Sequence, residues 1–300
     1  KMNTKSYELV TERLIELLEN GVAPWKRNFK VDRMTSPANF ASKKTYRGLN
    51  YFLLEGMQYF KGYKSSFWMT FRQVKDAGGK VIKGEKGMPV TYFNFLMKDK
   101  NGKKTMDEKQ AVEKIPFFKH SHVFNLDQIE GIEDPTKVID DEPLNDDVKP
   151  IEAAQNIIDN MPNKPAISID NNKLSSRGNP CYVPSQDEVR MPEMNRFKDA
   201  ENFYSVFFHE LIHSTGHESR LDRKGVGKGS SFGDAVYSKE ELIAEMGAAF
   251  LCNEARIDNS EIMENSAAYL DSWIKALKGD CKLAVQAASA AQKASEYILG

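Results

Sequence analysis

The sequence predicts an α+β protein of two domains joined by an acidic linker. Residues 1–100 carry 19 Lys and Arg against 9 Asp and Glu, whereas the other 200 residues carry 23 against 34. Residues 127–149 are rich in acidic side chains and prolines, which is typical of a solvated linker. Helical and strand-like patterns occur on both sides of that segment. We therefore expect a domain at 1–126, a linker at 127–149 and a domain at 150–300.

The first domain is expected to be an α+β domain that opens with an amphipathic helix. Apolar residues recur at helical spacing over residues 4–20, and Gly21 then ends the pattern. The remaining elements are expected in this order: a basic loop at 43–50, a helix from about Tyr51, a strand turning into a helix at 67–74, a basic glycine-containing hairpin at 78–87, and strands at 89–95 and 117–124.

Cations and aromatic side chains alternate along this first domain. Cations can follow the phosphates of a single nucleic-acid strand while aromatic faces stack on its unpaired bases. The alternative is that the aromatic residues form the core and the lysines merely solvate one face. On the first reading, the contacts to single-stranded DNA are expected from Trp25, Lys26, Tyr46, Arg47, Asn50, Trp68 and Lys83.

The second domain is expected to place a small sheet before a helical region. A helix is predicted at 151–161, followed by short strands at 166–169, 181–183 and 188–191. An edge strand of such a sheet could hold an extended peptide by main-chain pairing. Further helices are expected at 195–216, around 239–250, at 261–278 and at 281–298.

A metal-binding pattern lies in the first of these later helices. His209 and His213 are four residues apart, so they share one face of a helix and can hold one Zn²⁺. Glu210 is then placed to act as general base for a water on that metal. The alternative is a surface helix with chance histidines. It is disfavoured because His209, His213 and His217 account for three of the five histidines and apolar residues flank the pair.

A catalytic zinc site has three protein ligands and an open position. The third ligand is expected from the helix around 239–250, where Glu241 and Glu245 lie on one face. We expect Glu241 to bind the metal and Glu245 to hold the far nitrogen of a ligand histidine, although the two roles could be exchanged. His217 follows Gly216, where the helix should end, so it is a weaker candidate; as a fourth ligand it would make the site structural.

Cysteine use and hydropathy predict the cellular location. Cys181, Cys252 and Cys281 form no CxxC pair, which favours a reducing cytoplasm. No apolar run approaches the length of a membrane span, and no secretory leader is evident. We expect a cytoplasmic protein without a membrane partner.

The whole chain resembles the ArdC-type antirestriction proteins of conjugative plasmids and related mobile elements. The first domain matches them at Trp25 and at the motifs Tyr46–Asn50, Trp68–Gln73 and Lys83–Gly87. The second domain matches at the motifs His209–His213, Ser219–Arg223 and Glu240–Glu245, in the same order. The resemblance supports Glu241 as the third ligand, because similar zincins carry their ligand glutamate at this place.

This resemblance implies a single-stranded-DNA-binding domain, a zincin-like metallopeptidase domain and a role in protecting incoming DNA from host restriction. Two hypotheses follow. In the first, the protein is a zinc peptidase acting on an unidentified protein of the restriction system or associated with DNA. In the second, it is a non-catalytic single-stranded-DNA-binding protein whose second domain is a metal-stabilised scaffold.

Overall fold

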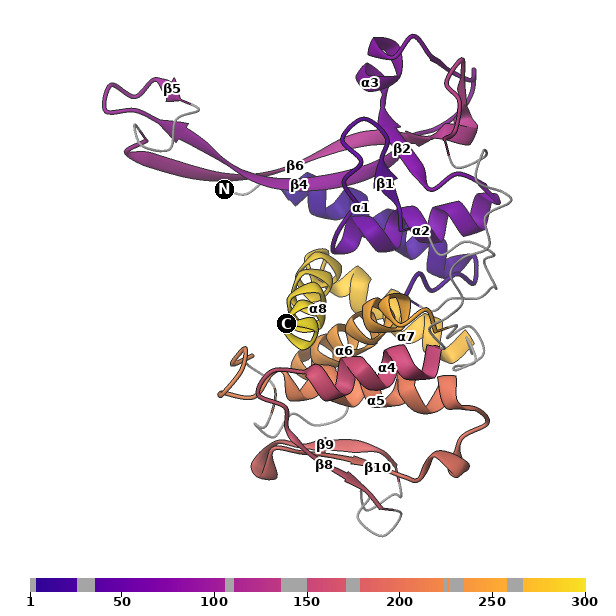
Figure 1. Ribbon diagram of the computed structural model, residues 1–300. Helices are drawn as coiled ribbons and strands as arrows, with labels where there is room; N and C mark the ends of the chain where they lie inside the picture. Colours follow the sequence, from indigo (N-terminus) through magenta and orange to yellow (C-terminus); the bar gives the residue numbers. More distant parts are fainter. Residues whose placement is uncertain are drawn as a thin grey trace.

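A computed structural model describes residues 4–25, 36–105, 111–135, 150–170, 179–223, 226, 235–257 and 267–300. It confirms a mixed α+β architecture in two parts. The five-stranded and the three-stranded sheet lie at opposite ends of the molecule, and most of the helices lie between them (Figure 1). The expected zincin-like helices with their small sheet form the second part.

The first part is built on a five-stranded sheet with the order β1-β2-β6-β4-β5. Its pairs are antiparallel except for β1 with β2. Strands β4 and β6 form a long hairpin that projects from the body of the molecule (Figure 1). Strand β3 pairs separately with β7. The strands are β1 (Ala38–Asn39), β2 (Phe67–Thr70), β3 (Lys80–Val81), β4 (Met88–Lys98), β5 (Lys104–Thr105), β6 (Glu113–Asn125) and β7 (Ile129–Glu130).

Helices α1 (Thr4–Glu19) and α2 (Leu49–Lys61) cover the side of this sheet that faces the second part (Figure 1). The periodicity of α1 buries Val10, Leu14 and Leu17 almost completely. The short helix α3 (Phe71–Asp76) starts directly after β2, where Thr70 and Gln73 form a reciprocal capping box. The strand-to-helix change expected at 67–74 is therefore confirmed.

Two expected DNA contacts, Trp25 and Trp68, are wrong because both rings are buried in the core at 1% exposure. The Trp25 indole donates a hydrogen bond to the Tyr269 hydroxyl at 2.9 Å, across the junction of the two parts. Trp68 lies in β2 and packs edge to face against Tyr63, with ring centroids 6.0 Å apart. A ring enclosed in this way cannot stack on a base.

The second part contains a three-stranded sheet with the order β8-β10-β9. Strand β10 pairs in parallel with β8 and antiparallel with β9, so β9 is an edge strand among the described residues. The elements before the site helices are α4 (Pro150–Asn160), β8 (Ala166–Ile169), β9 (Cys181–Val183), the 3₁₀ turn η3 (Pro184–Gln186), β10 (Glu188–Met191) and the 3₁₀ turn η4 (Met194–Arg196).

Four further helices complete this part: α5 (Ala200–Ser214), α6 (Ala235–Glu254), α7 (Ala267–Gly279) and α8 (Leu283–Leu299). Helix α5 is shorter than the predicted 195–216. It begins after Asp199, whose side chain accepts a hydrogen bond from the Asn202 amide, and Thr215 follows its last residue. Gly216 lies beyond the end of the helix.

The two parts share one continuous cluster of buried side chains that runs from α1 and α2 into α5, α6, α7 and α8. Polar contacts also cross the junction: Thr11 donates to the Cys281 carbonyl at 2.8 Å, and Arg47 forms an ion pair with Glu296. Residues 127–130, which were predicted to begin the linker, instead form the end of a 3₁₀ turn, η1 (Leu126–Gln128), and β7 of the first part. Residues 136–149 lie outside the described residues.

None of the described helices is both long enough and apolar enough to cross a membrane.

Candidate metal centre

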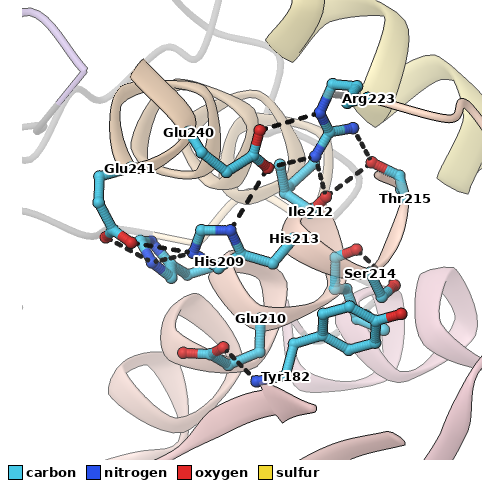
Figure 2. Close-up of polar contacts among 11 residues, drawn as sticks. Tyr182, His209, Glu210, Ile212, His213, Ser214, Thr215, Arg223, Glu240 and Glu241 are labelled. Atoms are coloured by element: carbon cyan, nitrogen blue, oxygen red, sulfur yellow. Dashed lines mark hydrogen bonds and ion pairs between the residues drawn. The ribbon is translucent and has the colours of Figure 1, made fainter. Parts of the chain in front are cut away.

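Helix α5 presents the two motif histidines side by side. The Nε2 atoms of His209 and His213 are 3.1 Å apart, and their ring planes are nearly perpendicular with centroids 4.8 Å apart (Figure 2). One helical turn separates them, so a spacing of four residues places both on one face. Both side chains are partly buried: 18% of the surface of His209 and 15% of that of His213 is exposed.

Glu241 on α6 points at this pair, as predicted from its helix. Its carboxylate oxygens lie 3.6 Å from Nε2 of His209 and 3.5 Å from Nε2 of His213 (Figure 2). One ligand atom from each of the three residues lies within 4.8 Å of the others, and no second group of this kind occurs in the described part of the chain. Two imidazole nitrogens and one carboxylate match the donor set of catalytic zinc sites.

His217 does not join this group. It lies in the turns after α5, and its Nδ1 pairs with the Ser219 hydroxyl at 2.8 Å. Within the described structure, a metal held by His209, His213 and Glu241 alone would have coordination positions left for water and substrate.

The close approach of α5 and α6 depends on Gly247. A Cβ atom at this position would lie 2.6 Å from the Ile212 side chain, which is below any normal contact distance. The absence of a side chain at Gly247 lets α6 pack close enough for Glu241 to reach the histidines.

Glu240 orients His213, and the sequence analysis did not identify this role. Its carboxylate lies 3.4 Å from Nδ1 of His213 and accepts hydrogen bonds from the Arg223 guanidinium at 2.6 Å and 3.2 Å (Figure 2). Burial would raise the pKa of Glu240, but the hydrogen bonds from His213 and Arg223 outweigh it and lower that pKa. An ionised Glu240 fixes the Nδ1–H tautomer and leaves Nε2 free for a metal.

Glu245, the residue expected in that role, lies one turn further along α6. Its charge contributes to the raised pKa of His209, and its carboxylate interacts with the Tyr269 hydroxyl. The carboxylate beside Nδ1 of His213 is therefore Glu240, whereas Glu245 as the group that holds the far nitrogen of a ligand histidine remains a prediction.

Glu210 lies on the side of α5 that faces the small sheet. Its carboxylate accepts a hydrogen bond of 2.8 Å from the backbone amide of Tyr182 in the edge strand β9 (Figure 2). The base candidate is thus held between the metal ligands and the strand that could pair with a peptide.

Arg220 fixes that strand against α5. Its side chain is fully buried, donates to the Ser214 carbonyl at 2.8 Å and forms an ion pair with Asp187 in the turn between β9 and β10. Asp187 in turn accepts a hydrogen bond of 2.8 Å from the Tyr182 hydroxyl. Arg220 and Arg223 are thus both paired with acidic side chains.

The carboxylates around His209 create a strongly negative site. Burial alone would lower the pKa of His209, but Glu241, Glu210 and Glu245 outweigh it and raise that pKa to about 9. The same negative field would attract a divalent cation, so charge and donor atoms both fit a metal ion.

The other expected DNA contacts lie in the first part and differ in exposure and in hydrogen bonding. Lys83 and Arg47 are exposed, although Arg47 pairs with Glu296. Asn50 uses its side chain to bond the Thr91 backbone at 2.7 Å and 2.8 Å, and Tyr46 accepts a hydrogen bond from Asn39. Lys26 lies outside the described residues.

Two family models match this chain. Residues 4–124 match the N-terminal domain of anti-restriction factor ArdC, and residues 164–290 match a zincin-like metallopeptidase. Metal-free and Mn(II)-bound crystal structures of the antirestriction ArdC protein from plasmid R388 are 33% identical to this chain. They cover 97% of this chain and 96% of that protein, with TM-scores of 0.70 and 0.71 respectively.

Two relatives align over 98% of this chain. The uncharacterized protein y4eC of Sinorhizobium fredii is 31% identical, and the match covers 92% of its length. DNA primase TraC of Escherichia coli is 33% identical, but this chain spans only 27% of that protein.

Proposed function

Because this chain belongs to the ArdC family of antirestriction proteins, we propose that its first part binds single-stranded DNA and its second part hydrolyses peptide bonds at a metal ion. The two activities together would protect incoming mobile-element DNA from host restriction. The protein substrate would belong to the restriction system or be associated with the DNA.

The peptidase proposal rests on one arrangement: three ligand atoms within 4.8 Å of one another, with Glu210 on the adjacent turn of the same helix. We favour Zn²⁺ as the resident ion because two imidazoles and a carboxylate are its usual catalytic donors. Mn²⁺ is the rival, since the R388 protein has been crystallised with Mn(II).

When bound, the ion would lower the pKa of a coordinated water and polarise the substrate carbonyl. Glu210 would accept the proton of the attacking water and return it to the leaving amine. The Tyr182 amide holds one carboxylate oxygen of Glu210, so the side chain is positioned before substrate arrives. Among the described strands, β9 lies at the edge of the small sheet next to that carboxylate. An edge strand can hold an extended peptide by main-chain pairing.

The variant Glu210→Gln distinguishes between a peptidase and a protein whose second part is only a metal-stabilised scaffold. The variant keeps His209, His213 and Glu241, so it should bind one metal ion per chain, as wild type does. Hydrolysis of unfolded protein substrates should fall by about 10² to 10⁴, the usual contribution of a general base. Full protection of plasmid DNA from restriction by this variant would favour the non-catalytic alternative.

The DNA-binding proposal rests on the excess of basic residues in the first hundred positions. Affinity for an oligothymidylate should fall steeply with salt, because cation–phosphate contacts release counterions. Titration of single-stranded and duplex DNA of equal length at several salt concentrations tests this. A preference for duplex would contradict it.

A further inference from the structure

A cleft of about 630 Å³ lies at the junction of the two parts. We call it the interdomain cleft; its walls include Tyr7, Phe93 and Phe118 from the first part and Arg223, Lys239 and Lys293 from the second. These residues come from α1, β4 and β6 of the first part and from α6, α8 and the loop after α5 of the second.

The charged side chains that line the interdomain cleft are all cations, and one of them, Arg223, is paired with Glu240. Three cations line it, and no Asp or Glu occurs among the described residues of its wall. Lys282 adds a fourth cation nearby, with its Nζ 6.0 Å from the centre of the Tyr7 ring. This is notable because residues 101–300 carry more acidic than basic side chains. An anionic ligand is therefore favoured.

Aromatic side chains on the hairpin give the cleft a second recognition element. Phe93 is 54% exposed and touches the exposed ring of Phe95 edge to face, with centroids 5.1 Å apart. Deeper in, Phe118 stacks on Tyr7 at 4.2 Å. Cations beside an exposed aromatic face suit a ligand with both phosphates and unpaired bases.

One cation of the cleft also belongs to the metal centre. Arg223 holds Glu240, and Glu240 holds Nδ1 of the ligand His213. The four hydrogen bonds that Arg223 makes to Glu240, Thr215 and Ile212 use four of its five N–H groups within the described structure. One N–H can thus serve a ligand in the cleft.

We propose that the interdomain cleft binds a segment of single-stranded DNA, with a base on Phe93 and phosphates on Lys239 and Lys293, and that Arg223 couples this segment to the metal centre. This inference rests on the proposed single-stranded-DNA binding and adds its location and its regulatory effect. A phosphate that accepts a hydrogen bond from Arg223 shares the positive charge of Arg223, so less of that charge neutralises Glu240. The Glu240 carboxylate then binds the Nδ1 proton of His213 more strongly. Bound DNA therefore raises metal affinity, and metal raises DNA affinity by the same factor.

The test measures binding of a fluorescent oligothymidylate and of Zn²⁺, each with and without the other. Wild type should show a mutual increase of about fivefold or more. Lys239→Gln/Lys293→Gln and Phe93→Ala should each weaken oligothymidylate binding by about tenfold. The oligothymidylate affinity of the lysine variant should also depend less steeply on salt concentration. Both should bind Zn²⁺ alone like wild type, because none of these side chains contacts the metal ligands.

Lys75→Gln/Lys275→Gln is the matched control, since it removes the same charge from exposed positions on α3 and α7 outside the cleft wall. Cleft variants that bind oligothymidylate as tightly as this control would overturn the cleft assignment. Tight DNA binding without any change in Zn²⁺ affinity would overturn the coupling. If wild type itself fails to bind the oligothymidylate, the proposed function fails and this inference fails with it. An acidic peptide that binds in place of DNA would also overturn the inference.

Discussion

At the scale of single residues, protons and a metal ion compete for the imidazole of His209. Metal binding needs its neutral imidazole, yet the surrounding carboxylates raise its pKa to about 9 in the metal-free protein. Protons and metal ions thus compete for the same nitrogen below that pH.

We therefore expect metal binding at pH 7 to release about one proton from His209. Apparent affinity should rise as pH increases towards 9 and then level off, because the imidazole is already neutral above its pKa. Calorimetry in buffers of different ionisation enthalpy measures the released protons directly. Affinity that is constant between pH 6 and 9 would contradict the raised pKa.

The residues of the site differ in how far the sequence could predict them. A spacing of four on a helix fixes the relation of His209 and His213 whatever surrounds them. The sequence could not show which of Glu240, Glu241 and Glu245 orients a ligand histidine. The answer depends on how α6 is rotated about its axis and on the contact of Glu240 with Arg223 from the preceding loop.

At the scale of elements, the contact between α5 and α6 sets the ligand geometry. Gly247→Ala places a methyl group against Ile212, and the helices must separate to accommodate it. We expect a loss of about 1–3 kcal/mol in the free energy of unfolding. Metal affinity should fall as well, because Glu241 moves with α6. Denaturant unfolding and metal titration of the same variant measure both effects.

Gly279→Ala provides the control, since a Cβ atom at the end of α7 meets nothing within 4 Å. It should leave metal affinity unchanged. Equal metal affinity in the two glycine variants would mean that the helix contact does not position Glu241.

Element prediction from the sequence succeeded where periodicity was strong, as in α1 and α5. It erred at Trp25 and Trp68, because an aromatic residue beside cations has the same pattern whether it faces solvent or another layer of the fold. The second part buries Trp25, and its position relative to the first part cannot be read from local periodicity.

At the scale of the whole molecule, one buried cluster runs through both parts. Trp25 of the first part bonds Tyr269 of α7, which also interacts with Glu245 next to the metal centre. Folding of the two parts should therefore be coupled.

Tyr269→Phe removes the acceptor of the buried Trp25 indole, at a cost of about 1–3 kcal/mol in the free energy of unfolding. Urea unfolding followed by tryptophan fluorescence and by far-ultraviolet circular dichroism should show one coincident transition, shifted to lower urea. Two separate transitions in wild type would show that the parts fold independently.

The central claim is an open metal site formed by His209, His213 and Glu241. A crystal structure of the metal-loaded protein with anomalous data at the zinc and manganese edges tests it most directly. We expect one ion bound by Nε2 of both histidines and by the Glu241 carboxylate, with water in the remaining positions. An ion closed off by His217, or one that Glu241 does not reach, would contradict the claim.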